Sequence, residues 1–130
     1  MRCQSFLCPL ALCFEDGKEY HMTPEALEIS LENFARLRAS EEHYILLDVR
    51  EPFEIRLASF PEHVNIPLKL LLEDVEQLAK DQKIVTLCHL GVRSLNACLF
   101  LREQGFKDVV SLAGGIDAWA RQIDSTIPVY

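Results

Sequence analysis

The sequence lacks an excess of positive charge. It carries 13 Lys and Arg against 20 Asp and Glu, a formal net charge of −7. This balance argues against nucleic acid and anionic membrane surfaces as partners. The charge is uneven, because residues 1–82 hold 8 basic and 16 acidic side chains whereas residues 83–130 hold 5 and 4. A small anionic ligand is therefore repelled least by the C-terminal part of the chain.

Paired cysteines are also lacking. The five cysteines are odd in number, form no CxxC pair and show no zinc-ligand spacing with the four scattered histidines. We therefore expect neither a disulfide framework nor a metal site, and no motif indicates a cofactor. Free thiols of this kind suit a reducing compartment, so we expect a cytoplasmic protein.

No apolar run reaches the roughly 20 residues that a transmembrane helix needs. Residues 1–21 nevertheless differ from the rest, with a short apolar stretch from Cys3 to Phe14 that Pro9 interrupts. We interpret residues 1–24 as a loosely attached N-terminal extension and residues 25–130 as one domain. Two alternatives stay open: residues 1–21 act as a signal or lipid anchor, or Met22 is the natural start.

Short apolar segments alternate with amphipathic ones along the rest of the chain. Strands are expected over residues 26–29, 44–47, 63–65, 84–87 and 108–112. Helices are expected over residues 31–38, 52–57, 68–79, 94–104 and 116–121. Ser30 suits the cap of the first helix, and Pro52 suits the first position of the second. This alternation predicts an α/β fold in three layers, with a mostly parallel five-stranded sheet and helices on both faces.

The stretch from Ile84 to Ser94 has the strongest chemical signal. Apolar and β-branched residues lead to Cys88, as in a strand covered on both faces. Gly91 permits a tight turn, and Ser94 is expected to cap the following helix. Loop amides and a helix N-terminus near Cys88 favour a thiolate, and Arg93 adds a permanent positive charge. A purely structural cysteine would not explain Gly91 and Arg93 in the same short loop.

A second polar pair, Asp48 and Arg50, follows the strand at 44–47. Ligands of open α/β sheets bind outside the carboxyl ends of the strands. If this strand lies beside the one that ends at Cys88, then Asp48, Arg50, Cys88 and Arg93 converge on one edge of the sheet.

Five segments occur in an order that is familiar from one family: Leu47–Glu51, Val64–Pro67, Cys88–Ser94, Gly105–Phe106 and Gly114–Trp119. Between Ile29 and Tyr130, about four-fifths of the chain, the sequence resembles a single-domain rhodanese, a sulfurtransferase. It departs from the family pattern after Leu57, where a His-Ile-Pro-Gly-Ala run is usual and this chain has Ser59, Phe60, Glu62 and His63. That departure affects a local turn and not the loop after Cys88.

The resemblance implies that Cys88 takes a sulfane sulfur from a small anionic donor such as thiosulfate and becomes a persulfide. A thiol, or cyanide in an assay, then removes the sulfur. Asp48, Arg50 and Ser94 would support the loop, and Arg93 would hold the loop or the donor. The persulfide would be stabilised by the backbone amides of the substrate-binding loop, formed by His89, Leu90, Gly91, Val92 and Arg93.

Several alternatives stay open at this point. His89 is expected at the rim rather than as a general base, and Cys98 is expected in the helix core rather than as a resolving thiol. A cysteine phosphatase or arsenate reductase is a rival, but such phosphatases place five residues between Cys and Arg, whereas four separate Cys88 from Arg93. A persulfide relay that serves a protein partner and an inactive interaction module are further rivals. The sequence leaves open whether the protein is a monomer or a dimer.

Overall fold

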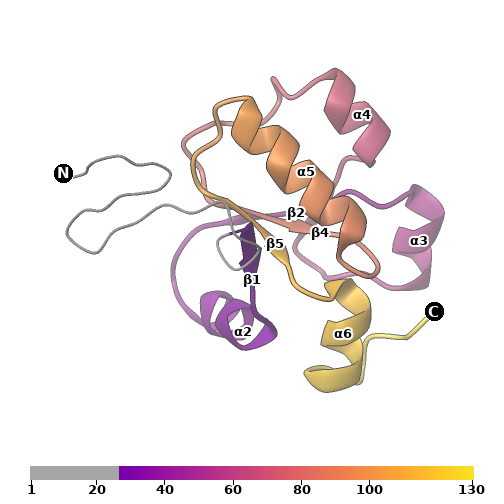
Figure 1. Ribbon diagram of the computed structural model, residues 1–130. Helices are drawn as coiled ribbons and strands as arrows, with labels where there is room; N and C mark the ends of the chain where they lie inside the picture. Colours follow the sequence, from indigo (N-terminus) through magenta and orange to yellow (C-terminus); the bar gives the residue numbers. More distant parts are fainter. Residues whose placement is uncertain (1–26) are drawn as a thin grey trace.

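The computed structural model describes residues 27–130, so the interpretations of residues 1–24 and of Met22 lie outside the described residues. Strands and helices alternate regularly through the described part (Figure 1). The strands are β1 (Glu28–Ile29), β2 (Ile45–Asp48), β3 (His63–Asn65), β4 (Ile84–Leu87) and β5 (Val109–Leu112). The helices are α2 (Leu31–Ala39), α3 (Pro52–Leu57), α4 (Leu68–Glu73), α5 (Val92–Glu103) and α6 (Gly115–Gln122).

The five strands form one sheet in the order β1-β5-β4-β2-β3, and every neighbouring pair is parallel. Helices α4 and α5 lie on one side of this sheet, and α2 and α6 lie on the other (Figure 1). The arrangement confirms the predicted three-layer α/β fold with a five-stranded sheet. Within residues 27–130, none of the helices has the length and apolar character needed to cross a membrane.

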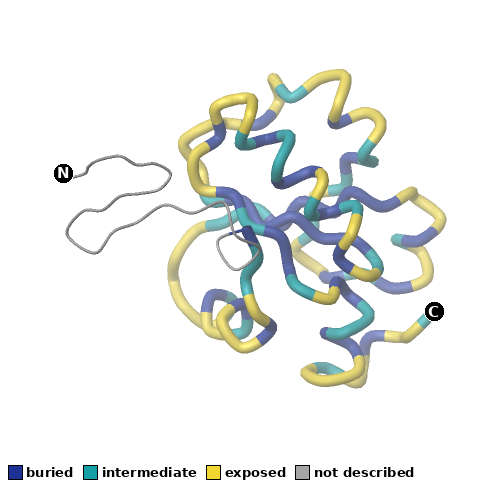
Figure 2. The backbone as a smooth tube through the Cα atoms, in the orientation of Figure 1, coloured by how far each residue is buried: buried dark blue, intermediate teal, exposed yellow. Residues whose placement is uncertain are grey.

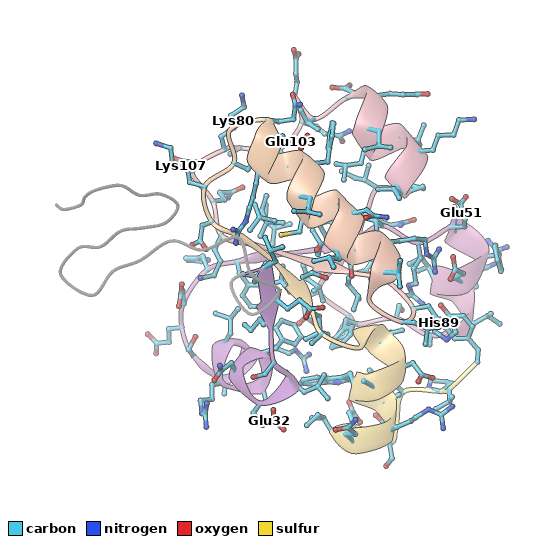
Figure 3. The ribbon with its side chains drawn as sticks, in the orientation of Figure 1. Glu32, Glu51, Lys80, His89, Glu103 and Lys107 are labelled. Atoms are coloured by element: carbon cyan, nitrogen blue, oxygen red, sulfur yellow. The ribbon has the colours of Figure 1, made fainter. Side chains whose placement is uncertain are left out.

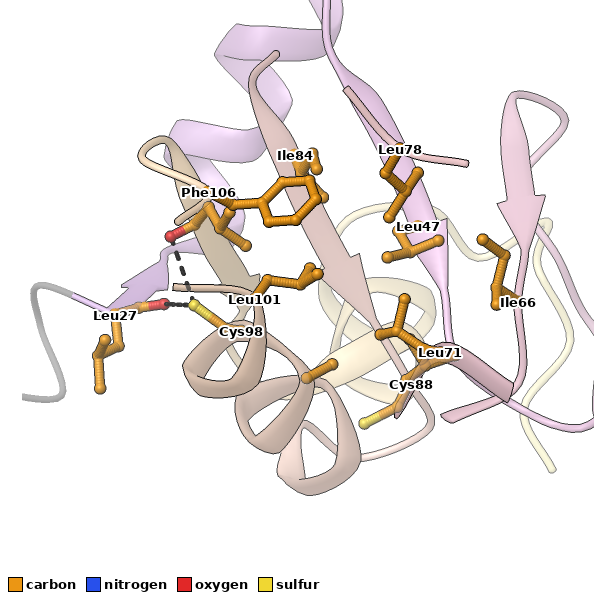
Figure 4. Packing of buried hydrophobic residues seen from close by; sticks show 13 residues of the cluster. Leu27, Leu47, Ile66, Leu71, Leu78, Ile84, Cys88, Cys98, Leu101 and Phe106 are labelled. Atoms are coloured by element: carbon orange, nitrogen blue, oxygen red, sulfur yellow. Dashed lines mark hydrogen bonds between the residues drawn. The ribbon is translucent and has the colours of Figure 1, made fainter. Parts of the chain in front are cut away.

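Each face of the sheet has its own apolar core. Leu47, Ile84 and Val109 pack with Leu71 and Leu101 beneath α4 and α5 (Figure 4). Alternate residues of the same strands point to the opposite face, where an aromatic group made by Phe34, Phe60 and Trp119 packs under α2 and α6. The central strand β4 is buried along its whole length (Figure 2). Trp119 is therefore a core residue.

Local signals in the sequence set several element boundaries correctly. The hydroxyl of Ser30 accepts the backbone N–H of Asn33 at 3.1 Å and caps α2. Pro52 begins α3, where its missing N–H leaves no bond unmade. Gly105, with a φ of 97°, follows the end of α5.

Two predicted helix boundaries are wrong. The helix expected over 68–79 ends at Glu73, because the carboxylate of Asp74 accepts the backbone N–H of Glu76 at 3.0 Å and competes with the helical pattern. The helix expected to start at Ser94 already begins at Val92, with Gly91 as its N-cap at a φ of 101°. Ser94 therefore lies inside the helix, and its hydroxyl is free for another contact.

Candidate active site

The predicted convergence of polar residues depends on β2 and β4 being neighbours, and they are. Asp48 pairs in register with Leu87, so the residues that follow both strands emerge at the same edge of the sheet. Cys88 lies there with only 1% of its surface exposed. It forms a cup of about 120 Å³ together with the exposed loop that follows it, namely His89, Leu90, Val92 and Arg93.

The sulfur of Cys88 has two polar neighbours. The backbone N–H of Gly91 donates to Sγ at 3.0 Å, and the Ser94 hydroxyl oxygen lies 3.3 Å from Sγ. A thiolate can only accept hydrogen bonds, so in that state the Ser94 hydroxyl donates to the sulfur. One loop amide, that of Gly91, therefore bonds to Sγ itself, and Ser94 contacts the sulfur through its side chain instead of capping α5.

Ser111 on β5 continues this hydrogen-bonded chain, although no motif in the sequence indicates it. Its hydroxyl lies 2.7 Å from that of Ser94, and both residues are fully buried. When Ser94 donates to the sulfur, its oxygen is left to accept from Ser111. Thr86 fixes the backbone of the same turn by donating to the Ser94 carbonyl at 2.8 Å. Three hydroxyl side chains therefore hold the first turn of α5 against the nucleophile.

The carbonyl groups of the loop are held by the start of α6. The backbone N–H of Ile116 donates to the Cys88 carbonyl at 2.9 Å, and that of Asp117 donates to the His89 carbonyl at 3.0 Å. Gly115 makes this approach possible, because a Cβ at this position would lie 2.3 Å from the His89 oxygen. The Gly114-Gly115 turn seen in the sequence is thus a direct structural support of the loop.

Asp48 and Arg50 form an ion pair in the interior, and both side chains are fully buried. The guanidinium donates to Asp48 Oδ1 at 2.9 Å and to Oδ2 at 2.7 Å. It also donates to the Ala58 carbonyl at 2.8 Å and to the Tyr130 hydroxyl at 2.8 Å. Arg50 therefore connects the end of β2 to Ala58, which follows α3, and to Tyr130 in the C-terminal segment.

Arg93 lines the cup and also forms a two-pronged bond with Glu54 of α3, at 2.7 Å and 2.9 Å. This bond to Arg93 lowers the pKa of Glu54 to about 2. Glu54 is a site residue that sequence reasoning missed. Its only local signal is a capping box with Glu51 at the start of α3, which explains helix formation and not the contact with the loop.

The side chain of His89 is held at the rim of the cup. Its ring stacks on Tyr130, with centroids 4.0 Å apart and planes 10° from parallel, and its Nε2 lies 3.9 Å from Asp117. Figure 3 places His89 on the loop, beside the C-terminal segment. Leu90 and Val92 extend outward with 59% and 68% of their surface exposed.

Cys98 belongs to the core and not to the site. Its thiol lies 3.3 Å from the Val109 carbonyl and 3.7 Å from that of Leu27, in a different part of the core from Cys88 (Figure 4). Burial raises the pKa of this thiol. Cys88 is therefore the thiol that the described fold presents to a ligand.

Known proteins match this chain over most of its described part. The rhodanese-like domain model matches residues 30–122. A sulfurtransferase from Allochromatium vinosum is 37% identical over 94 residues, which cover 72% of this chain and 88% of that protein. The adenylyltransferase and sulfurtransferase MOCS3-1 of Zea mays is 34% identical over 117 residues, which make up 25% of its length.

Solved structures agree with these matches. A rhodanese-related protein from Thermoplasma volcanium superposes with a TM-score of 0.68 at 33% identity, covering 75% of this chain and 93% of that one. The human single-domain sulfurtransferase TSTD1 gives a TM-score of 0.65 at 25% identity, covering 73% and 96%. The sequence match, the parallel sheet and the loop after Cys88 lead to one conclusion: the chain belongs to the rhodanese-like domain family.

Proposed function

We propose that this protein is a sulfurtransferase that carries a sulfane sulfur as a persulfide on Cys88. The observation that supports this most directly is the environment of Sγ, with one amide and one hydroxyl donor at 3.0 Å and 3.3 Å at the bottom of a small cup. Such donors stabilise negative charge on sulfur. A cup of about 120 Å³ has room for a small donor such as thiosulfate.

The reaction has two displacement steps. In the first, the Cys88 thiolate attacks the outer sulfur of thiosulfate, a new S–S bond forms, and the S–S bond of the donor breaks. Sulfite leaves with the electron pair, and the terminal sulfur of the persulfide carries the charge. In the second, a thiolate or cyanide attacks that terminal sulfur and regenerates the Cys88 thiolate. No proton transfer is needed when both nucleophiles are already anionic.

Each loop residue has a role in this scheme. Gly91 and Ser94 stabilise the anionic sulfur, and Arg93 attracts the negatively charged donor. His89 supports the loop from the rim through its contacts with Tyr130 and Asp117, and the scheme needs no base because both nucleophiles are already anionic. Leu90 and Val92 provide an apolar rim, and Asp48 and Arg50 hold the surrounding segments together.

A protein acceptor is a second candidate for the sulfur's destination. The exposed apolar side chains of Leu90 and Val92, beside the cup, favour contact with a partner surface. Relatives such as the maize protein join a rhodanese-like region to a much longer chain. In this version the first step is unchanged, and a thiol of the partner makes the second attack in place of a small molecule.

Intact-mass spectrometry after thiosulfate treatment tests the proposal. The wild type should gain one sulfur, and cyanide should remove it. Cys88→Ser should gain none, whereas Cys98→Ala, which removes the buried thiol of the core, should behave as the wild type. A sulfur retained on Cys88→Ser, or absent from the wild type, would contradict a persulfide at this position. Efficient transfer to cyanide favours the small-molecule enzyme, and persulfide formation with poor cyanide turnover favours the relay.

A further inference from the structure

Tyr130 contacts three separate parts of the site. Its ring stacks on His89 with centroids 4.0 Å apart. Its hydroxyl accepts from Arg50 at 2.8 Å and donates to Glu54 at 2.9 Å. The residues bonded to this one side chain are 76 and 80 positions away in the sequence, so no local pattern brings them together.

The bond to Glu54 matters most, because it reaches the cup. Oε1 of Glu54 accepts both the Tyr130 hydroxyl and Nη2 of Arg93, each at 2.9 Å. Two donors from different segments therefore meet at this one oxygen, and the Glu54 carboxylate sets the direction of the Arg93 guanidinium. If the tyrosine hydroxyl is removed, Oε1 of Glu54 loses its anchor in the C-terminal segment, and only the Glu51 backbone N–H at 3.0 Å still ties the carboxylate to α3, so the carboxylate and Arg93 can shift together.

We propose that Tyr130 is a positioning residue that orients Arg93 through Glu54, and the loop through His89, for an anionic reactant at Cys88. This inference deepens the proposed function, and the importance of Tyr130 for sulfur transfer rests on that function. Tyr130 itself is not one of the residues that line the cup, and it reaches them only through Glu54 and through the outer face of His89. Its effect is therefore selective for negative charge on the incoming reactant.

The molecule contains a matched control. Tyr44 donates to Glu62 at 2.8 Å, and Glu62 accepts a two-pronged bond from Arg38 at 2.7 Å and 3.1 Å. This triad repeats the chemistry of Tyr130, Glu54 and Arg93. It lies where β2 and β3 begin, at the edge of the sheet opposite to Cys88. Tyr44→Phe therefore removes an equivalent hydroxyl without touching the site.

Alkylation of Cys88 by iodoacetate and by iodoacetamide tests the inference without requiring sulfur transfer. The two probes have similar size and differ in charge, and the modified Cys88 peptide is quantified by mass spectrometry. Tyr130→Phe should lower the ratio of the iodoacetate rate to the iodoacetamide rate by about 3- to 10-fold, the loss expected for a displaced charge-assisted contact. Tyr44→Phe should leave the ratio within about twofold of the wild type, the tolerance expected at an independent site.

The outcomes separate this inference from the proposed function. An unchanged ratio in Tyr130→Phe, measured at a temperature where circular dichroism shows folded protein, would overturn it. So would an equal fall in Tyr44→Phe, because the effect would then reflect general stability.

Tyr130→Ala is the second variant, and it should lower both alkylation rates in addition, since it also removes the ring stacked on His89. A wild type that forms no persulfide refutes the proposed function and leaves the ratio test valid. With thiosulfate, Tyr130→Phe should raise KM more than it lowers kcat.

Discussion

Replacing Asp48 by Asn would leave the guanidinium of Arg50 in the interior without its counter-charge. Both side chains are fully buried, and Asp48 accepts two of the guanidinium's hydrogen bonds as well as the Arg50 backbone N–H at 3.1 Å. Removing one partner of a buried ion pair costs about 3–5 kcal/mol. We expect about 3 kcal/mol here, because the Asn oxygen still accepts one of these bonds.

Urea unfolding followed by Trp119 fluorescence measures this loss. With a slope of about 1.5 kcal/mol per molar urea, typical of a small domain, the midpoint of Asp48→Asn should fall by about 2 M. The control is Asp108→Asn, the same substitution in a pair at the protein surface. There, Oδ2 of Asp108 lies 3.3 Å from Nζ of Lys83. That variant should lose no more than about 1 kcal/mol. Equal shifts in the two variants would refute the reasoning from burial.

The same variant separates a structural role of the pair from a catalytic one. Asp48→Asn combined with Arg50→Met should recover part of the lost stability, because no charge then remains buried. At a temperature where all variants are folded, Asp48→Asn should form the Cys88 persulfide at a rate within about threefold of the wild type, as expected for a group that makes no contact with the sulfur. A loss of a hundredfold would instead place the ion pair among the determinants of turnover.

Three further outcomes are expected. Ser94→Ala should slow persulfide formation by about tenfold, the loss of one hydrogen bond to an anion, and an unchanged rate in stopped-flow measurements would remove Ser94 from the reaction. Because the pKa of Glu54 is lowered to about 2, its ionised carboxylate stabilises the fold above pH 4.5, and this stabilisation is lost as the pH falls toward 2. The urea midpoint of the wild type should therefore fall over this pH range, and that of Arg93→Gln should fall less. Gly115→Ala should lower the melting temperature and the alkylation rate of the nucleophile, because the new Cβ meets a loop carbonyl at 2.3 Å. Gly105→Ala, which meets only a lysine side chain at 3.7 Å, should affect stability alone.

Several features of the protein follow from the sequence by itself. Buried strands such as Ile84–Leu87 appear in the sequence as runs of apolar and β-branched residues without alternation. Ser30 marks a helix start through a bond made within three residues, and Pro52 marks one because it lacks an N–H. The position of Cys88 at a strand end, before a glycine, follows from the same short-range chemistry. Short-range contacts are readable because the residues that make them are already neighbours in the chain.

The tertiary structure decided what surrounds the nucleophile. The placement of β4 between β5 and β2 brings Ser111 beneath Ser94, and the packing of α3 brings Glu54 to Arg93. Ser94 was expected as a cap from its residue type alone, and its inward contact became visible only with the strand order. Tyr130 reaches Arg50 across 80 residues of sequence. Such contacts depend on how strands order themselves in the sheet, which is a property of the packed core and not of any local segment.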